Sequence, residues 1–277
     1  MPIDAFFSLR FGNVITKCYL CRMNLRQTSY VAPEYAALGA LQDFVCRLPD
    51  LFAESGEVIY SKRNEVRVFQ IAGQRWVVKR YKRPNLVQRL SCSLGRKSKA
   101  HRAFLYADRL RRMGIDTPAP VAAVDCYRGL VYEQGYFVSA EDRRPSCMDL
   151  RDRPELPYRE ALAQALAHYL VTLHARGFLH GDTNLGNFLY SREADGTFRF
   201  AVIDVNRSRF VASPTRRQCL ANLTRLSHRR EVLRLVVGAY AAERGWDVAA
   251  TVEDVIGRVQ RFERRKELLR KLKRKKT

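Results

Sequence analysis

The sequence lacks a long apolar run. No stretch of its 277 residues approaches the roughly 20 apolar residues that a transmembrane helix needs. Phe6, Phe7 and Leu9 form a short apolar group near the N-terminus. Asp4 and Arg10 flank that group and no small-residue cleavage site follows it, so we do not expect a secretory signal.

Cysteine and histidine are too few and too irregularly spaced for a disulfide framework or a zinc cluster. The chain has seven cysteines, an odd number, and only Cys18 and Cys21 form a C-x-x-C pair. The five histidines supply no second ligand pair at a matching spacing. We therefore expect reduced, mostly structural cysteines and a cytoplasmic protein.

Acidic residues are scarce relative to basic ones. The chain has 28 Asp and Glu against 50 Lys and Arg, a formal net charge of +22. This surplus favours an anionic partner, such as nucleic acid, an anionic membrane surface or a polyanionic substrate, although a solvated basic surface is the plain alternative. Hydrophobic residues make up 47% of the chain, which argues against global disorder. The length suits two modest cores or one large α/β domain.

The N-terminal half is rich in strand-like segments. Residues 1–30 show no clear period and form either a loose arm or an untranslated stretch, with Met23 as an alternative start. Short segments rich in β-branched and aromatic residues then predict an antiparallel sheet. They cover residues 57–60, 65–71, 75–81, 121–124, 129–133 and 136–139. Apolar residues at helical spacing predict one helix over residues 98–113, which ends at Gly114.

The C-terminal half is mostly helical. A polar stretch with two prolines, residues 141–157, predicts a linker, and residues 158–176 form an amphipathic helix. A loop over residues 180–187 and two short strands follow. We therefore expect an arm at 1–30, a β-rich lobe at 31–140, a helical lobe at 141–257 and a basic helix or tail at 258–277.

The loop at residues 180–187 carries the strongest functional signal. It reads His-Gly-Asp-Thr-Asn-Leu-Gly-Asn, so Asp182 and Asn187 have the Asp-x4-Asn spacing of a kinase catalytic loop. Asp204 ends the second apolar strand after the loop. Phosphoryl transfer needs a carboxylate that accepts the proton of the acceptor hydroxyl, and oxygen ligands for Mg²⁺. We assign Asp182 as the catalytic base and Asn187 and Asp204 as metal ligands.

A lysine in the first half completes the pattern. Lys79 follows Trp76-Val77-Val78 on a predicted strand ahead of a helix, the position of the lysine that contacts nucleotide phosphates. Each motif alone is weak, and the competing interpretation is structural, with Asp182 and Asn187 as turn formers and Asp204 as a helix cap. Their shared order, each on the expected element, favours catalysis. His180 is interpreted as a structural residue that holds the loop.

The loop and three further segments of the sequence resemble a known family. The loop is similar to the His-Gly-Asp variant of the kinase fold, in which glycine stands at 181 where protein kinases usually have arginine, and Asn184 stands where they usually have lysine. Residues 77–81, 114–120 and 203–207 resemble the lipopolysaccharide core kinases of the Kdo/WaaP type. The resemblance runs from about residue 31 to about residue 225.

The resemblance implies a bilobal, protein-kinase-like α+β fold, with an antiparallel sheet and one helix in the N-lobe and a mostly helical C-lobe. It implies ATP as phosphate donor, Mg²⁺ as cofactor, and a Kdo or heptose hydroxyl of the lipopolysaccharide inner core as acceptor. The partner would be a lipid A-core glycolipid at the cytoplasmic face of the inner membrane. By position, Lys79 would hold phosphates, Asp182 would be the base, and Asn187 and Asp204 would bind the metal.

Three features depart from protein kinases. The turn at residues 61–64 has no glycine, so Lys62 or Arg63 would contact phosphates by charge. The helix at 98–113 has no glutamate to pair with Lys79, which leaves Asp108 or Asp204 as its expected partner. Val205-Asn206 replaces the usual Phe-Gly. Two alternatives stay open: a kinase-fold enzyme acting on a protein or soluble small molecule, and a non-catalytic scaffold.

The C-terminal residues 258–276 are mostly Arg and Lys. Val255, Val259, Phe262, Leu269 and Leu272 fall close to one helical face. One interpretation is a surface helix attracted to anionic lipid; the other is a solvated helix that frays. Aromatic residues do not alternate with the basic ones as stacking platforms would require, which argues against nucleic acid.

Overall fold

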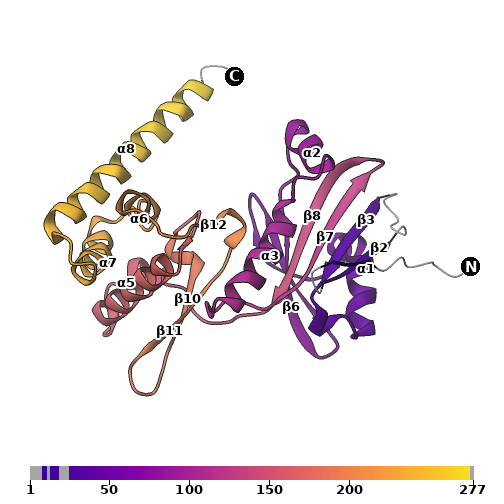
Figure 1. The fold of residues 1–277 in the computed structure, drawn as a ribbon, viewed down its shortest axis with the longest axis horizontal. Coiled ribbons are helices and arrows are strands. Elements are labelled where there is room, and N and C mark those ends of the chain that lie inside the picture. Colours follow the sequence, from indigo (N-terminus) through magenta and orange to yellow (C-terminus); the bar gives the residue numbers. More distant parts are fainter. Residues whose placement is uncertain (1–7, 11–12, 19–24, 275–277) are drawn as a thin grey trace, which may run out of the picture. The chain divides into compact units, whose positions relative to one another are not determined.

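The structure is a computed structural model of the 277-residue chain, and it describes residues 8–10, 13–18 and 25–274. The chain divides into two compact units, Met1–Arg143 and Arg144–Thr277 (Figure 1). The boundary expected from the sequence was after residue 140, next to the polar stretch at residues 141–157 in which the observed boundary lies. None of the helices built from described residues combines the length and apolarity needed to cross a bilayer.

Unit 1 is built on an eight-stranded sheet in which all neighbouring strands are antiparallel. The order across the sheet is β1-β2-β3-β7-β8-β6-β5-β4. The strands are β1 (Ser8–Arg10), β2 (Asn13–Cys18), β3 (Arg26–Val31), β4 (Glu57–Ser61), β5 (Glu65–Ile71), β6 (Gln74–Arg80), β7 (Pro120–Arg128) and β8 (Val131–Ala140). The expected antiparallel meander at residues 57–81 corresponds to β4, β5 and β6.

Strand β8 joins two segments that the sequence separated, residues 129–133 and 136–139. The interruption came from Gly135, which pairs with Asp125 of β7 within the ladder. A Cβ atom at this position would lie 2.4 Å from the hydroxyl oxygen of Tyr132 and 3.1 Å from the Cβ of Ala100 on α3 (Lys99–Arg112). Glycine therefore makes room for the Tyr132 hydroxyl and for the neighbouring helix, and it does not mark a turn.

Residues 26–31 correct the expectation of a loose arm through residue 30. They form β3, which pairs with β7 with Ser29 opposite Val124, and Val31 is fully buried. Buried positions alternate with half-buried ones, but two of the buried side chains are polar, and Gln27 donates through its side-chain amide to Val45 O at 2.8 Å. A buried glutamine and serine concealed the strand period in the sequence. Cys21 and Met23 lie outside the described residues.

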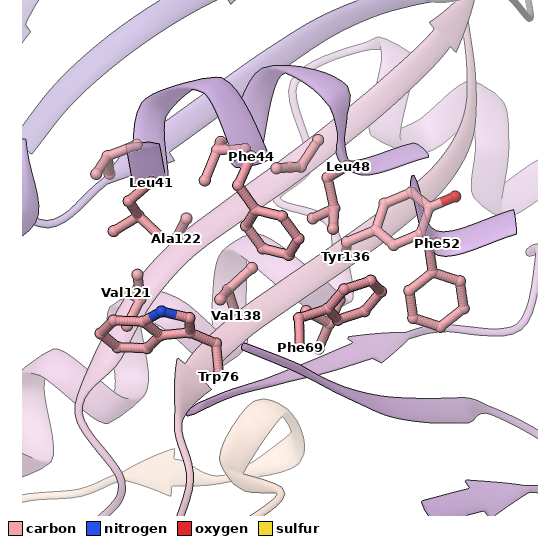
Figure 2. Packing of buried hydrophobic residues seen from close by; sticks show 14 of the residues in the cluster. Leu41, Phe44, Leu48, Phe52, Phe69, Trp76, Val121, Ala122, Tyr136 and Val138 are labelled. Carbon is pink, nitrogen blue, oxygen red and sulfur yellow. The ribbon is translucent and has the colours of Figure 1, made fainter. Parts of the chain in front are cut away.

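Helix α1 (Gly39–Glu54) covers one face of the sheet, as Figure 2 shows. Leu41, Phe44, Leu48 and Phe52 all point into the sheet and are at most 3% exposed. Each such side chain contributes roughly 2 kcal/mol through removal of apolar area from water. This helix was not among the elements expected from the sequence, and it contains Pro49 on its buried side.

Helix α3 (Lys99–Arg112) packs on the opposite face of the same sheet. Adjacent residues of β7 show this, since Ala122 belongs to the cluster under α1 and Ala123 to the cluster under α3. Ser98 caps α3 by accepting a hydrogen bond from His101 N at 3.0 Å, at the predicted helix start. Unit 1 therefore has α1 and α2 (Leu86–Ser93) in addition to the single helix that was expected, and the short 3-10 turn η1 (Pro33–Tyr35).

Unit 2 is mostly helical, as expected. Its helices are α4 (Asp149–Asp152), α5 (Arg159–Ala175), α6 (Arg216–Leu223), α7 (Arg230–Glu243) and α8 (Val248–Arg274). Two short antiparallel ladders accompany them: β9 (Phe178–Leu179) with β12 (Arg209–Phe210), and β10 (Phe188–Arg192) with β11 (Phe198–Val202). The 3-10 turn η2 (Leu185–Asn187) ends the loop over residues 180–187, and the 3-10 turn η3 (Val205–Arg207) follows β11.

Helix α8 differs from the expected basic tail. It begins at Val248, ten positions before the predicted start, and its first turns pack on α7. Val255 is fully buried and Val259 is 4% exposed, so they belong to the core of unit 2. The apolar stripe that the sequence suggested for a membrane is therefore partly used for packing. The side chains of Leu269 and Leu272 lie outside the described residues.

Candidate active site

The loop that carries Asp182 is held at both ends by short ladders. Leu179 of β9 pairs with Arg209 of β12 just before the loop, and Phe188 of β10 pairs with Val202 of β11 just after it. Ile203 N also donates to Asn187 O at 3.0 Å. The sequence produces this arrangement because two apolar pairs of short strands enclose a polar segment. The loop and the end of β11 are thereby fixed side by side within unit 2.

His180 joins these two segments. Its side chain is 1% exposed, its Nε2 lies 2.9 Å from Ile203 O, and its Nδ1 accepts from Asp182 N at 3.1 Å. These partners define one tautomer, with the proton on Nε2. Burial lowers the pKa of His180, which keeps the ring neutral at physiological pH. This geometry agrees with the interpretation of His180 as a structural residue.

Asp182 and Asn187 are linked directly. The Asn187 side-chain amide donates from Nδ2 to Asp182 O at 2.8 Å. Because the nitrogen is used in this bond, the amide oxygen is the atom that can face a cation. The five-residue spacing in the sequence therefore corresponds to a closed turn, in which one ligand candidate holds the backbone of the candidate base.

Asp204 follows β11 in a left-handed backbone conformation, with φ of 57°. Asn206 donates through Nδ2 to Asp204 Oδ1 at 2.5 Å. A non-glycine residue in this region costs about 1 kcal/mol, although Asp and Asn tolerate it best. Strain of this kind is found at functional sites, where the fold holds a side chain in one direction. The structure thus brings Asp182, Asn187 and Asp204 together in unit 2.

Two arginines flank the Asp182 carboxylate, and sequence reasoning did not identify them. Arg207 Nη1 lies 3.6 Å from Oδ2, and Arg225 Nη1 lies 3.4 Å from Oδ1. Arg207 stands three residues after Asp204, within a segment already noted for resemblance. Arg225 lies 43 positions from Asp182 and belongs to no motif. Both guanidinium groups are about two-fifths exposed, so they can also contact an anionic ligand.

Asn222 of α6 holds the loop by hydrogen bonds to His180 and Thr183. Its side-chain amide donates to His180 O, and its Oδ1 lies 3.0 Å from Nε2 of the buried His174. The hydroxyl of Thr183 in turn bonds to Asn222 O. These contacts tie α5, α6 and the loop together. The backbone around Asp182 is therefore positioned by buried hydrogen bonds rather than by exposed ones.

Gly181 lies against the backbone of Arg207. A Cβ atom at this position would be 2.1 Å from Arg207 O and 2.7 Å from Arg207 Cβ. Gly181→Ala should therefore displace Asp182 or Arg207 and lower kcat by about 100-fold, the usual cost of misplacing a catalytic group by about 1 Å. Steady-state kinetics of the purified variant would measure this loss.

Gly186→Ala is the matched control, because the nearest atom to a Cβ there is Asn184 Oδ1 at 3.4 Å. It lies in the same loop and adds the same methyl group, and we expect a change in kcat of less than about threefold. Equal kcat for Gly181→Ala and the wild type would contradict the assigned contact.

Lys79 lies in unit 1, on β6. It pairs with Val66 of β5 and Phe137 of β8, and its Nζ lies 5.3 Å from the centre of the Tyr81 ring. Because side chains alternate along β6, Lys79 and Tyr81 lie on the face of the sheet that α3 covers. Asp108, the only acid of α3, forms an ion pair with Arg112 one turn further along the helix.

The glycine-free turn between β4 and β5 borders a basic hollow of about 180 Å³. Its cationic lining side chains come from the turn, from β6 and from the segment after β6: Lys62, Arg63, Arg80, Lys82 and Arg83. Glu65 pairs with Arg80 inside this group, at 2.5 Å. The hollow therefore offers charge where a glycine-rich turn would offer backbone N–H groups.

The donor set in unit 2 fits Mg²⁺ only as part of a nucleotide complex. No group of three or more His, Cys, Asp or Glu side chains capable of holding a metal occurs in the part of the chain that the structure describes. Mg²⁺ commonly uses one or two protein oxygens and takes its other ligands from phosphates and water. Asn187 and Asp204 together offer two such oxygen donors.

Comparison with known proteins agrees with these features. The family model described as "Lipopolysaccharide kinase (Kdo/WaaP) family" matches residues 50–247. A search of curated proteins gives no match. Together with the two-unit architecture, the family match, which covers more than half of the chain, confirms the predicted bilobal, protein-kinase-like fold class.

Solved structures are similar at low identity. WaaP in complex with acyl carrier protein is 19% identical, with 80% of this chain and 91% of that chain covered and a TM-score of 0.49. The Rio2 kinase-ADP/Mg²⁺-phosphoaspartate complex from Chaetomium thermophilum is 16% identical, with coverage of 89% and 81% and a TM-score of 0.43. Monomeric WbdD is 19% identical, with coverage of 72% and 44% and a TM-score of 0.40.

Proposed function

The chain belongs to the lipopolysaccharide kinase (Kdo/WaaP) family, and from this membership we propose that it transfers phosphate from ATP to a Kdo or heptose hydroxyl of the lipopolysaccharide inner core. The observation that carries the proposal is the linked arrangement of Asp182, Asn187 and Asp204 around His180. A scaffold without activity would not need the left-handed Asp204 or the direct bond between Asn187 and Asp182.

In this proposal Asp182 binds the acceptor hydroxyl and accepts its proton. The hydroxyl oxygen bonds to the γ-phosphorus of ATP while the bond from that phosphorus to the oxygen bridging the β- and γ-phosphates breaks, and ADP leaves. Arg207 and Arg225 lie beside the carboxylate and orient it, and their partly exposed guanidinium groups attract the anionic acceptor. His180 transmits no proton, because both ring nitrogens are engaged with backbone atoms. Its role is to keep the loop and the end of β11 at a fixed separation.

The candidate metal ligands and the candidate phosphate contacts lie in different parts of the chain. Asn187 and Asp204 supply oxygen ligands for Mg²⁺, and Lys79 and the basic hollow at the β4–β5 turn contact phosphates. When bound, Mg²⁺ neutralises the negative charge of the phosphates during transfer. The protein's own contribution is to position these donors before substrate arrives.

Lys79→Ala should raise the KM for ATP or lower kcat/KM by about 10- to 100-fold, since one charge-assisted contact with phosphate is lost. Lys79→Arg should restore part of the loss. Lys271→Ala, an exposed lysine on α8, serves as the control and should leave ATP kinetics unchanged. An ATP titration at saturating acceptor measures the difference. Unaltered KM and kcat in Lys79→Ala would remove Lys79 from the nucleotide site.

The function is tested with purified protein, Mg²⁺-ATP and deacylated lipopolysaccharide core as a soluble acceptor. Mass spectrometry should show one added phosphate, and fragmentation should locate it on Kdo or heptose. Two control acceptors, a protein substrate such as casein and a free monosaccharide, address the alternative acceptor classes. Phosphate transfer only to a control acceptor would reject the core sugar as substrate. Absence of ATP turnover with every one of these acceptors would reject the kinase assignment.

We also propose a peripheral position on the cytoplasmic face of the inner membrane, where a lipid A-core acceptor would be presented. A net charge of +22 favours approach to an anionic surface. The basic α8 would strengthen this attraction in a salt-dependent way. The partners in the proposal are the glycolipid substrate and the anionic membrane surface, with no nucleic acid.

A further inference from the structure

Helix α2 of unit 1 turns its apolar side chains to the solvent. All eight residues of Leu86–Ser93 are described and none is buried. Leu86 is 61% exposed, Val87 76% and Leu90 45%, and Leu94 at the C-cap is 88% exposed. We call these four residues the α2 apolar patch. Their spacing places them within an arc of about 100° around the helix axis.

The polar residues of α2 face the sheet instead. Arg89 Nε donates to Tyr132 O at 2.9 Å, and the same guanidinium pairs with the buried Glu133. One turn further on, Ser93 Oγ accepts from Tyr132 N at 2.9 Å. An ordinary surface helix buries its apolar face and solvates its polar one. In α2 the polar face is turned toward the sheet and hydrogen bonds hold the helix in place, while the apolar face is exposed to solvent.

The chain segments on either side of the patch carry positive charge. Between Tyr81 and Asp108 the chain has seven basic residues and no acidic one. Four of these basic side chains are exposed next to α2 in the sequence: Lys82, Arg83, Arg96 and Lys97. A hollow of about 120 Å³ beside the helix is lined by Lys82, Arg96, Lys97, Lys99 and Arg102. Apolar side chains with basic residues on their flanks are the pattern of a helix that lies in a lipid interface.

We propose that α2 is a membrane-docking surface, with the α2 apolar patch inserted at the headgroup–acyl boundary of an anionic bilayer and Lys82, Arg96 and Lys97 against lipid phosphates. A second copy of the chain fits the patch poorly, because its own cations would meet these ones. An anionic bilayer offers both complements at once, apolar chains and phosphate charge. Leu130, 78% exposed in the turn that leads into Tyr132, adds to the apolar surface of unit 1.

Helix α8 is less suited to insertion. Val255 and Val259 are buried in unit 2, which leaves its described exposed surface largely charged. It attracts anionic lipid by charge, whereas α2 adds an apolar contact that salt does not screen. The same charged substitution should therefore weaken vesicle binding more on α2 than on α8.

The test compares two exposed leucines that receive the same charge. Leu94→Glu lies on α2 and Leu268→Glu on α8, where Leu268 is 61% exposed. Co-sedimentation uses vesicles of equal parts phosphatidylglycerol and phosphatidylcholine, with pure phosphatidylcholine as the neutral series. We expect Leu94→Glu to lower the partition coefficient at least tenfold, as loss of one buried leucine implies, and Leu268→Glu to lower it less than twofold.

A third variant, Val87→Ser, removes an apolar side chain without adding a charge, and it should weaken binding about fivefold or more. Circular dichroism and melting temperature check that each variant is folded, which is expected because all three positions are exposed. Wild-type binding by Leu94→Glu and Val87→Ser would overturn the proposal, as would an equal loss in Leu268→Glu. Sedimentation velocity without lipid adds one more outcome: a wild-type dimer that Leu94→Glu separates, with vesicle binding unchanged, would assign the patch to a second copy.

Membrane docking would bring the protein to its proposed lipid-anchored acceptor, and in that respect the inference rests on the proposed function. The vesicle experiment contains neither ATP nor sugar acceptor, so the two can fail separately. Vesicle docking without phosphate transfer would reject the kinase assignment alone. Transfer to soluble core without any difference between Leu94→Glu and wild type on vesicles would reject the docking surface alone.

Discussion

Asp182→Ala should lower kcat by about 1,000-fold while the protein stays folded. The carboxylate is the proposed acceptor of the hydroxyl proton, so its removal takes away the group that assists the attack of the hydroxyl. Its side chain is one-third exposed, and its contacts with Arg207 and Arg225 are long, so the folded state should lose little stability. Single-turnover transfer and thermal unfolding of the same preparation measure the two effects.

Asp182→Asn refines this experiment. Asparagine keeps the shape of the side chain and the backbone bonds to His180 and Asn187, but it cannot accept the proton. A loss equal to that of alanine would indicate proton acceptance, and a much smaller loss would indicate that the side chain mainly orients the hydroxyl. Glu253→Ala, at an exposed acid of unit 2, controls for the change in net charge. Near wild-type turnover in both Asp182 variants would refute the base assignment.

The second large effect is expected for Asp204→Asn, with a loss of about 1,000-fold in kcat/KM for ATP and weaker binding of Mg²⁺-ATP. Asparagine tolerates the left-handed conformation that Asp204 adopts, whereas alanine would add strain of about 1 kcal/mol. The asparagine variant therefore tests the negative charge with little change in the backbone. Binding of a fluorescent ATP analogue, with Mg²⁺ and with EDTA, measures the coupling between metal and nucleotide.

In the wild type, Mg²⁺ should increase analogue affinity, and Asp204→Asn should remove most of that increase. Asn206→Ala provides a second arm, because Asn206 donates to Asp204 Oδ1 and its loss frees the carboxylate without removing it. We expect an intermediate reduction in Mg²⁺ dependence for this variant. An unchanged Mg²⁺ response in Asp204→Asn would exclude Asp204 as a ligand.

The local order of the active-site segment could be predicted from sequence, because its signals are short-range. The spacing of Asp182 and Asn187 and the two short strands after them define one continuous stretch of chain, and the structure closes it with neighbouring hydrogen bonds. Arg225 and Asn222 could not be found this way. They reach the loop only through the packing of α6, and tertiary contacts of this kind leave no local pattern.

The misses in unit 1 have different physical causes. Helix α1 was not expected, although the apolar spacing of Leu41, Phe44 and Phe52 is present in the sequence; burial of this face stabilises the helix in spite of Pro49. In β3 the buried polar residues broke the alternation that marks a strand. Helix α2 has an apolar spacing that predicts a buried face, yet the structure exposes it. Periodicity therefore indicates a helix and an apolar face, and it does not reveal what covers that face.

The strand order of unit 1 has a consequence for biosynthesis. Strands β1–β3 and β4–β6 each pair locally, but β7 and β8 alone connect the two groups in the centre of the sheet (Figure 1). During translation the edges of β3 and β6 would therefore stay unpaired until residues 120–140, which form β7 and β8, leave the ribosome. Completion of the sheet depends on a late hairpin, so a nascent chain stalled before it would present aggregation-prone edges to chaperones.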